Sequence, residues 1–397
     1  MNPKNLIEVR GAAGVENHCP VQFKKAYDLC VAKTRTNIQR LADDPKSAAL
    51  AVDGDYFSFK EGFHEIGNWT SSFFTGMALL AWRETEDEFF LRQVLRLAPH
   101  YHDKVTTRQR ETHHDLGFLY SLYSVALYKL TRDARHLDDG IRAAEVLAKR
   151  FNEKGNFIRA WGWLDTAEFE DMAIIDCLMN LPLLHWAATE TGDKKFYDLA
   201  VRHADMALKV FVRPDASVYH AYRFDLKTGQ PARGDTYGGC AVESHWARGA
   251  AWAIYGFALS HGYTRDEKYL DASVRLARKF IAGLDDEIVP LWDFKLNLCP
   301  AAPRIRDASA ASIAVCGFQE LLKYHPDETA FTQAKEKLLS RLCAADYLNF
   351  DPACPGIQRN GQVGDPQALA KNAYTSWGDY YLMEALGREL GHGGSWW

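Results

Sequence analysis

The sequence has 397 residues, of which 47% are hydrophobic, so it can bury a large core and is long enough for more than one domain. The formal net charge of −5 and the pI near 6.3 leave no broad basic surface, which argues against nucleic acid as a partner. No stretch is apolar enough for a membrane span, and the 8 cysteines include no CxxC pair, which indicates a reducing compartment.

The first residues, about 20, are interpreted as a short N-terminal extension. They have no apolar run behind a basic start, so they do not resemble a secretory signal. We therefore expect a cytoplasmic protein, or a periplasmic one if a leader was removed.

Two kinds of helical segment alternate along the rest of the chain. One kind is nearly free of charge for about four turns, which indicates helices that are buried on every side. Its members are 69–82, 116–130, 174–189, 246–260, 308–322 and 376–386. The other kind is amphipathic, as in 266–282. We predict an inner ring of buried helices enclosed by an outer ring, that is, a single all-α (α/α)6 barrel domain over residues 1–397.

Strand patterns are few and fall in long connections that lead into inner helices. Short extended pieces are predicted around 53–59 and 218–224. Because long connections inside a compact domain are usually functional, the active site is expected at the end of the barrel where inner helices begin.

The little charge that the inner helices carry is placed at or near their starts, at Asp115, Asp176, Arg248, Asp307 and Asp379. For Asp307 and Asp379 a structural role is the stronger interpretation, because a carboxylate at a helix N-terminus accepts backbone N–H bonds. Arg248 opposes the helix dipole there and needs an anionic partner, which is either one of the aspartates or a substrate carboxylate.

Asp115 follows His113 and His114, so a metal site is an alternative at this position. Adjacent histidines point in different directions on a helix, and the sequence has no HExxH motif or i,i+4 ligand pair. We expect no metal and no other cofactor.

Asp176 lies in a strongly apolar setting, and Pro182 is tolerated only in the first turn of a helix, which places Asp176 just before the helix. Burial would raise the pKa of this carboxyl group, and a second carboxylate nearby would raise it further. Such an acid still holds its proton near neutral pH and can donate it.

Six tryptophans are predicted at the mouth of the barrel or one turn inside it: Trp69, Trp161, Trp163, Trp246, Trp252 and Trp377. Each could be a core residue. Together at one end of a barrel they would also form a wall on which sugar rings stack.

The sequence resembles the unsaturated glucuronyl hydrolases, glycoside hydrolase family 88. The motifs that carry the resemblance are His-Asp-Leu-Gly-Phe at 114–118, Ile-Asp at 175–176 with Met-Asn-Leu-Pro at 179–182, and Trp-Ala-Arg-Gly at 246–249. The resemblance implies an (α/α)6 barrel and a metal-free site. It also implies removal of a 4,5-unsaturated glucuronic acid from the non-reducing end of an oligosaccharide by hydration of the C4=C5 double bond.

By this resemblance, each site residue has an expected role. Asp176 would be the acid and base, Asp115 would set its pKa and orientation, and His220 would support it. The sugar subsites would be lined by Trp69, His114, Trp161, Arg248, Trp252 and, as a looser match, Tyr374. The expected partner is a small acidic oligosaccharide, such as an unsaturated uronyl disaccharide, and we expect a monomer or a weak homodimer.

Two departures from the family leave the second sugar open. Family members often carry glutamine in a Thr-Tyr-Gln-Gly-Tyr run, where this chain has Thr-Tyr-Gly-Gly-Cys at 236–240. The stretch 358–371 also lacks the Ser and Lys pattern that some members use for a sulfate group.

Three alternative functions remain open. The sister family with the same barrel hydrolyses unsaturated galacturonyl-rhamnose, and the His-His-Asp cluster argues against it. A sugar 2-epimerase on an α/α barrel would use histidines as proton-transfer bases, for which His185, His220 and His245 are candidates. A pure sugar-binding module would leave Asp176 in its apolar setting unexplained.

Overall fold

A computed structural model of the chain describes residues 19–46, 49–57, 69–364 and 373–397. The predicted N-terminal extension lies almost wholly outside these residues, as does much of the stretch 358–371. Each buried segment predicted from the sequence contains a helix. The inner helices are α2 (Ser71–Thr85), α5 (Leu116–Tyr120), which continues through the π-helical turn η2 (Ser121–Val125) into α6 (Ala126–Thr131), α8 (Leu181–Thr191), α10 (Ala247–Thr264), α12 (Ala308–Leu321) and α14 (Ser376–Glu389).

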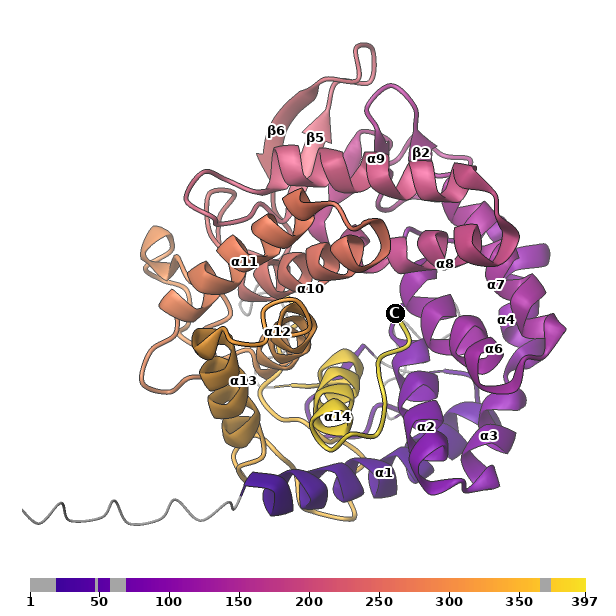
Figure 1. The fold of residues 1–397 in the computed structure, drawn as a ribbon, viewed down its shortest axis with the longest axis vertical. Helices are drawn as coiled ribbons and strands as arrows, with labels where there is room; N and C mark the ends of the chain where they lie inside the picture. Colours follow the sequence, from indigo (N-terminus) through magenta and orange to yellow (C-terminus); the bar gives the residue numbers. More distant parts are fainter. Residues whose placement is uncertain (1–18, 47–48, 58–68, 365–372) are drawn as a thin grey trace, which may run out of the picture.

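Outer helices alternate with the inner ones along the chain and surround them (Figure 1). They are α1 (Cys19–Asp43), α3 (Glu88–Leu95), α4 (Ala98–Thr106), α7 (Ala134–Ala148), α9 (Lys194–Phe211), α11 (Glu267–Ala282) and α13 (Thr329–Leu342). The inner ring closes on itself, because α2 contacts α5, α5 contacts α8, α8 contacts α10, α10 contacts α12, α12 contacts α14, and α14 contacts α2. The predicted (α/α)6 barrel is therefore confirmed.

The residue patterns explain which helices lie inside. Every residue of α10 from Ala247 to His261 is buried, whereas α11 buries one stripe that includes Leu270, Leu276 and Phe280. Several outer helices begin after an aspartate whose carboxylate accepts a backbone N–H of the first turn. These cap residues are Asp87, Asp133, Asp193 and Asp266.

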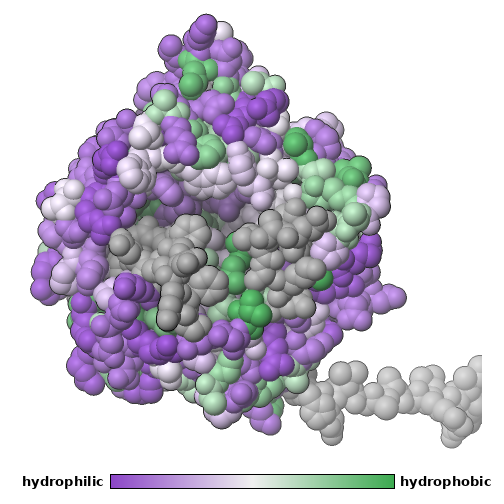
Figure 2. Space-filling model, turned by 180° about the vertical axis from the view of Figure 1, so that it is seen from behind, coloured by the Kyte–Doolittle hydropathy of each residue, from purple (hydrophilic) through white to green (hydrophobic). Residues whose placement is uncertain are grey.

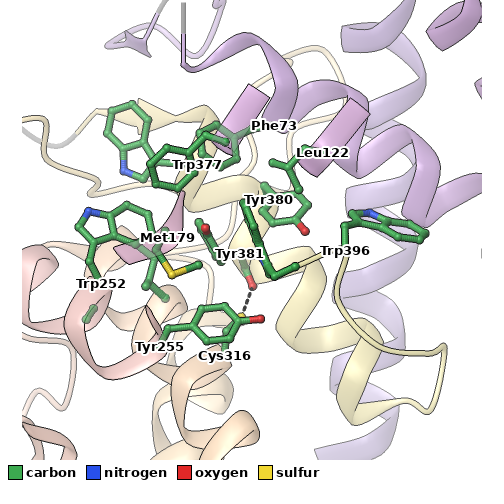
Figure 3. Close-up of a cluster of buried hydrophobic side chains, with 14 of the residues drawn as sticks. Phe73, Leu122, Met179, Trp252, Tyr255, Cys316, Trp377, Tyr380, Tyr381 and Trp396 are labelled. Atoms are coloured by element: carbon green, nitrogen blue, oxygen red, sulfur yellow. Dashed lines mark hydrogen bonds between the residues drawn. The ribbon is translucent and has the colours of Figure 1, made fainter. Parts of the chain in front are cut away.

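Aromatic side chains from the inner helices fill the interior of the ring (Figure 3). Tyr380 and Tyr381 of α14 meet Phe73 of α2 at ring distances of 5.7 and 5.9 Å. The C-terminal Trp397 stacks on Tyr381 at 6.0 Å, and its indole N–H donates to Glu384. The tail of the chain thus packs against the core from the C-terminal ends of the inner helices.

Short antiparallel strands lie in the connections. The predicted strand around 218–224 is present as β5 (Ala221–Phe224), which pairs with both β4 (Met172–Ile174) and β6 (Pro231–Asp235). The predicted strand around 53–59 is wrong for its described part, since 53–57 form bends and turns. The strand of this region is instead β1 (Leu50–Ala51), which pairs with β7 (Tyr374–Thr375).

The apolar segment 174–189 is not helical throughout, and Asp176 lies just before the helix, as predicted from Pro182. Ile174 ends β4, residues Ile175–Met179 form the 3₁₀ helix η3, and α8 starts only at Leu181. Pro182 explains the break, because it has no N–H for a preceding turn and its ring would clash with the carbonyl group four residues earlier.

None of the helices within the described ranges is both long and apolar enough to cross a bilayer.

Candidate active site

The predicted site residues gather where the inner helices begin. Asp115 is the N-cap of α5, Arg248 is the second residue of α10, and Trp69 stands two residues before α2. In Figure 1 the C-terminal end of α14 faces the viewer, so the N-terminal ends of the inner helices lie on the far side of the molecule. Figure 2 shows that side. That face is hollowed near its centre, and side chains of intermediate to hydrophilic character line the upper edge of the hollow (Figure 2).

The small sheet brings Asp176 and His220 together. Strand β4 pairs with β5 so that Ile174 lies opposite Ala221, and the N–H of Ile175 donates to the carbonyl group of His220 at 2.9 Å. Nε2 of His220 consequently lies 3.7 Å from Oδ2 of Asp176. Oδ2 has no hydrogen-bond partner among the described residues, although it is buried.

Asn180 and Gly117 join the two motifs that carry the aspartates. The Asn180 side chain accepts the N–H of Phe118 at 2.8 Å and donates to the carbonyl group of Asp176 at 3.3 Å. A Cβ at residue 117 would stand 2.2 Å from the Asn180 Cα, so only glycine allows this approach of α5. Both motifs can be recognised in the sequence, but the Asn180 side chain that ties them together is visible only in the structure.

Both carboxyl groups resist ionisation. Burial, followed by the charge of Asp176, raises the pKa of Asp115 to about 8, against a lowering effect of Arg150. Burial also raises the pKa of Asp176 to about 6, and the positive charge of Arg248 is the largest influence that lowers it. The raised pKa of Asp176 agrees with the prediction. Among the neighbouring charges, Arg248 has the largest effect on Asp176, and it stabilises the ionised form.

His220 is held in one tautomer. Its Nδ1 accepts the backbone N–H groups of Tyr237 at 3.0 Å and Gly238 at 2.8 Å. Burial lowers the pKa of His220 to about 3, so the ring is neutral and its single proton is on Nε2, the atom that faces Asp176. The ring can therefore donate toward this carboxyl group.

His114 lies against Asp115. Its Nε2 is 3.3 Å from Oδ1 of Asp115, and its side chain is fully buried. Burial holds the pKa of His114 well below its usual range, so the ring is neutral. Its backbone N–H donates to the carbonyl group of Ala160, which fixes the His114 and Asp115 segment to the connection that carries Trp161.

Arg248 has an aspartate as its partner. Its Nη1 lies 3.5 Å from Oδ2 of Asp307, and its guanidinium also donates to the backbone carbonyl groups of Gln362 and Val363. Oδ1 of Asp307 accepts the N–H groups of Ser309 and Ala310, as expected for a helix cap. Of the two partners weighed for Arg248, the structure provides the aspartate, and the Nε–H of Arg248 stays without a hydrogen bond among the described residues.

Aromatic rings line up beside these groups. Trp69 stacks on Trp377 at 4.7 Å, and the Arg248 guanidinium lies over both Trp377 and Trp246, at 5.1 and 4.5 Å. The Trp246 ring is 4.5 Å from the ring of His220. On the other side of His220, the rings of Trp161 and Tyr237 meet edge to face at 4.9 Å. These contacts form one continuous row, which we call the aromatic wall (Trp69, Trp377, Trp246, Trp161 and Tyr237).

Two further predicted site residues are Trp252 and Tyr374. Trp252 is fully buried, as His114 is, and it lowers the pKa of the Asp176 carboxyl group. Tyr374 lies in β7, away from the pair, with its ring against Gly356 and its hydroxyl group on Arg359. The structure gives Tyr374 no contact with the aromatic wall within the described ranges.

Other candidates are also placed. Asp379 does not cap α14, whose cap is Thr375; its carboxyl group instead accepts from the Tyr56 hydroxyl and from the backbone N–H of Gln358. His185 stacks on Tyr263, and Nδ1 of His245 accepts the N–H of Val218, so of the three histidines considered for an epimerase only His220 lies beside Asp176. Over the residues that the structure describes, no group of three or more His, Cys, Asp or Glu could hold a metal ion.

The arrangement defines a class of protein. Two buried carboxyl groups with raised pKa values, placed beside a wall of indole rings, are the equipment of a glycoside hydrolase.

Comparison with known proteins identifies the family. The model of Glycosyl Hydrolase Family 88 matches residues 55–282. An unsaturated chondroitin disaccharide hydrolase of Streptococcus pyogenes serotype M1 is 34% identical over 91% of this chain and 90% of its own length. An unsaturated glucuronyl hydrolase of Bacillus sp. (strain GL1) is 35% identical over 83% of this chain and 88% of its own length. The crystal structure of unsaturated glucuronyl hydrolase from Bacillus sp. GL1 covers 94% of this chain and 99% of its own, with a TM-score of 0.86 and 32% identity. The chain therefore belongs to glycoside hydrolase family 88.

Proposed function

We propose that this enzyme removes a 4,5-unsaturated glucuronic acid from the non-reducing end of a small acidic oligosaccharide by hydrating its C4=C5 double bond. The relatives named above are called unsaturated glucuronyl and unsaturated chondroitin disaccharide hydrolases, which supports this substrate class. The observation that carries the proposal is the unpartnered Oδ2 of Asp176, buried 3.7 Å from Nε2 of His220.

The proposed chemistry uses the protonated form of Asp176. Its carboxyl group donates a proton to C4 and accepts one from the water that adds at C5, so it ends the step protonated. The product is a hemiketal at C5, which opens to a C5 ketone and a hemiacetal at C1. Collapse of the hemiacetal gives an aldehyde at C1 and expels the second sugar as an alcohol. One water is consumed for each bond cleaved.

Neighbouring residues are assigned roles around this step. His220 donates from Nε2 toward Asp176 and orients it, and Asp115, which retains its proton up to about pH 8, adds no second charge. Arg248 is proposed to meet the uronate carboxylate, because its buried Nε–H has no partner among the described residues. The rings of Trp69 and Trp161 are proposed to stack on sugar faces.

The second sugar is expected to be bound without the glutamine contact common in the family. Gly238 occupies that position, and a Cβ there would stand 2.8 Å from the Trp246 ring. The cytoplasmic location, the single domain and the monomeric or weakly dimeric state stay predictions.

The first test uses the substrate's own chromophore. We expect the purified protein, given unsaturated disaccharides from a polysaccharide lyase, to abolish the ultraviolet absorbance of the conjugated double bond without added metal. A sugar 2-epimerase would leave the absorbance unchanged, and unchanged absorbance would contradict the proposed function. Disaccharides that differ in linkage and sulfation would then define the second sugar.

The pH dependence follows from the raised pKa of Asp176. Since the acid must be protonated to act and its pKa is about 6, we expect kcat/KM to be constant below about pH 6 and to fall about tenfold per pH unit above it. The measurement is a pH profile of kcat/KM with one disaccharide. A profile that stays flat up to about pH 8 would show that Asp176 does not act as the proton donor.

A further inference from the structure

Arg150 is a buried cation behind the active site that the proposed chemistry does not use. It follows α7, and its side chain is almost fully buried, with an exposed fraction of 3%. Among the described residues, its guanidinium donates to backbone carbonyl groups and not to a carboxylate. A buried cation without a counter-ion is costly unless its N–H groups are satisfied in another way.

Backbone carbonyl groups satisfy the guanidinium. Nη1 donates to Thr112 at 2.8 Å and Nε to Arg159 at 2.9 Å. Nη2 donates to Ala160 at 3.1 Å, Trp161 at 2.7 Å and Gly162 at 2.9 Å. Arginine suits this position because it is planar and presents five N–H donors in a fixed fork, which lysine cannot reproduce.

These carbonyl groups belong to two separate parts of the active site. Thr112 comes three residues before Asp115, and Trp161 belongs to the aromatic wall. The carbonyl group of Ala160 accepts from Arg150 and from the backbone N–H of His114, so one oxygen is shared by both segments. Movement of either segment would therefore disturb the hydrogen bonds of the other.

We propose that Arg150 is a positioning residue for the reaction: it holds the segment that carries Asp115 and the turn that carries Trp161 in a fixed relation. The inference rests on the proposed function, since it gives Asp115 and Trp161 a purpose. It goes further by assigning a role to a residue that does not touch the substrate. The charge of Arg150 also lowers the pKa of Asp115 against the effect of burial, which agrees with this close placement.

Arg159 provides a matched control. It is also an arginine, its side chain is also buried, and it too donates to backbone carbonyl groups, namely those of Gly162, Trp163 and Thr166. It thus braces the turn near Trp161 and makes no hydrogen bond to the segment of Asp115. The two arginines differ in whether they link that turn to the segment that carries Asp115.

The test is the steady-state kinetics of Arg150→Lys and Arg159→Lys with an unsaturated disaccharide, at one pH below about 6. Arg150→Lys is expected to lower kcat by about 10²-fold and to raise KM, because Asp115 loses its fixed position beside Asp176 and Trp161 loses its place in the aromatic wall. Arg159→Lys is expected to change KM alone. Equal kcat values for the two variants would overturn the proposal.

A second variant of Arg150 keeps the test decisive if Arg150→Lys does not fold. Arg150→Gln keeps amide donors without the charge, and thermal unfolding is recorded for all three proteins. If both Arg150 variants fail to fold while Arg159→Lys folds, Arg150 stabilises the whole domain and the positioning role is rejected. The wild-type enzyme separates this result from the proposed function: a wild type that leaves the chromophore intact rejects the function, whatever the variants do.

Discussion

Replacing Asp176 by asparagine is expected to lower kcat/KM for an unsaturated disaccharide by about 10²- to 10⁴-fold, because asparagine cannot supply or accept the proton. Asparagine has the same shape and can occupy the same space beside His220. The measurement is the rate of absorbance loss with wild type and variant at the same pH. Substantial remaining turnover would remove Asp176 from the role assigned to it.

The same substitution is expected to leave the protein as stable as wild type or more stable. The pKa of Asp176 is raised from 3.8 to about 6 in the folded chain, so ionisation of this group opposes folding as pH rises through this range. Above about pH 6 the cost is on the order of 3 kcal/mol, and Asp176→Asn removes it. Thermal unfolding near pH 7.5 should therefore show no loss of stability, which separates lost chemistry from lost fold.

Asp379→Asn is the control for this prediction. Asp379 is also a buried aspartate near the start of an inner helix, and burial raises its pKa to about 7. Its oxygens accept from the Tyr56 hydroxyl at 2.6 Å and from the N–H of Gln358 at 2.7 Å. Below about pH 6 Asp379 is protonated, so asparagine relieves no ionisation cost there. Asparagine offers only one accepting oxygen, so one of these donors loses its partner and stability at this pH falls by about 1–3 kcal/mol. Activity per folded molecule should change little.

The fold was predictable because the feature that determines it most strongly, the distribution of charged residues along the chain, is visible in the sequence. Segments without charge over about four turns have to be buried on all sides, and their alternation with amphipathic segments leaves few arrangements besides a double ring. The short strands were harder to predict. Residues 172–174 are apolar and lie next to an apolar helix, so only Pro182 indicates where the helical segment begins, and it gives no sign of a strand before it.

Site residues were predictable from the sequence where a charged residue interrupts an apolar segment. Asp176 and Arg248 are conspicuous because they are charged groups in apolar helices. Asn180 gives no such signal, because a neutral amide near a helix start is ordinary. That its side chain reaches Phe118 on another helix is a property of tertiary packing.

Side-chain position and the order of ionisation could not be inferred from the sequence either. Trp252, one turn along α10 from Arg248, is fully buried, whereas Trp163 has an exposed fraction of 44%. Nothing in the sequence around these two tryptophans indicates which side chain is more exposed. Likewise, the lower pKa of Asp176 relative to Asp115 depends on which carboxyl group Arg248 approaches, and this is fixed by the packing of α10 against η3.

Removing the cation of Arg248 is expected to have the second largest effect. Arg248→Met keeps an unbranched side chain between Trp246 and Trp377 but leaves Asp307 buried without its counter-charge. Breaking a buried ion pair by removing one partner typically costs about 3–5 kcal/mol of stability. We also expect kcat/KM to fall by about 10²- to 10³-fold, because a charge-assisted donor at the site is lost. Chemical denaturation and steady-state kinetics measure the two effects separately.

The double variant Arg248→Met/Asp307→Asn decides between the two roles of Arg248. Asparagine at 307 still caps α12 but leaves no uncompensated charge, so most of the lost stability should return. Activity should not return, because the substrate's carboxylate and Asp176 still lack their cation. If the double variant recovers both, Arg248 serves only the ion pair with Asp307, and the uronate must be bound by another group. If the double variant recovers stability alone, the positive charge of Arg248 acts on the reaction. The basic limb of the pH profile should then also shift to higher pH, because the charge of Arg248 lowers the pKa of Asp176 in the wild type.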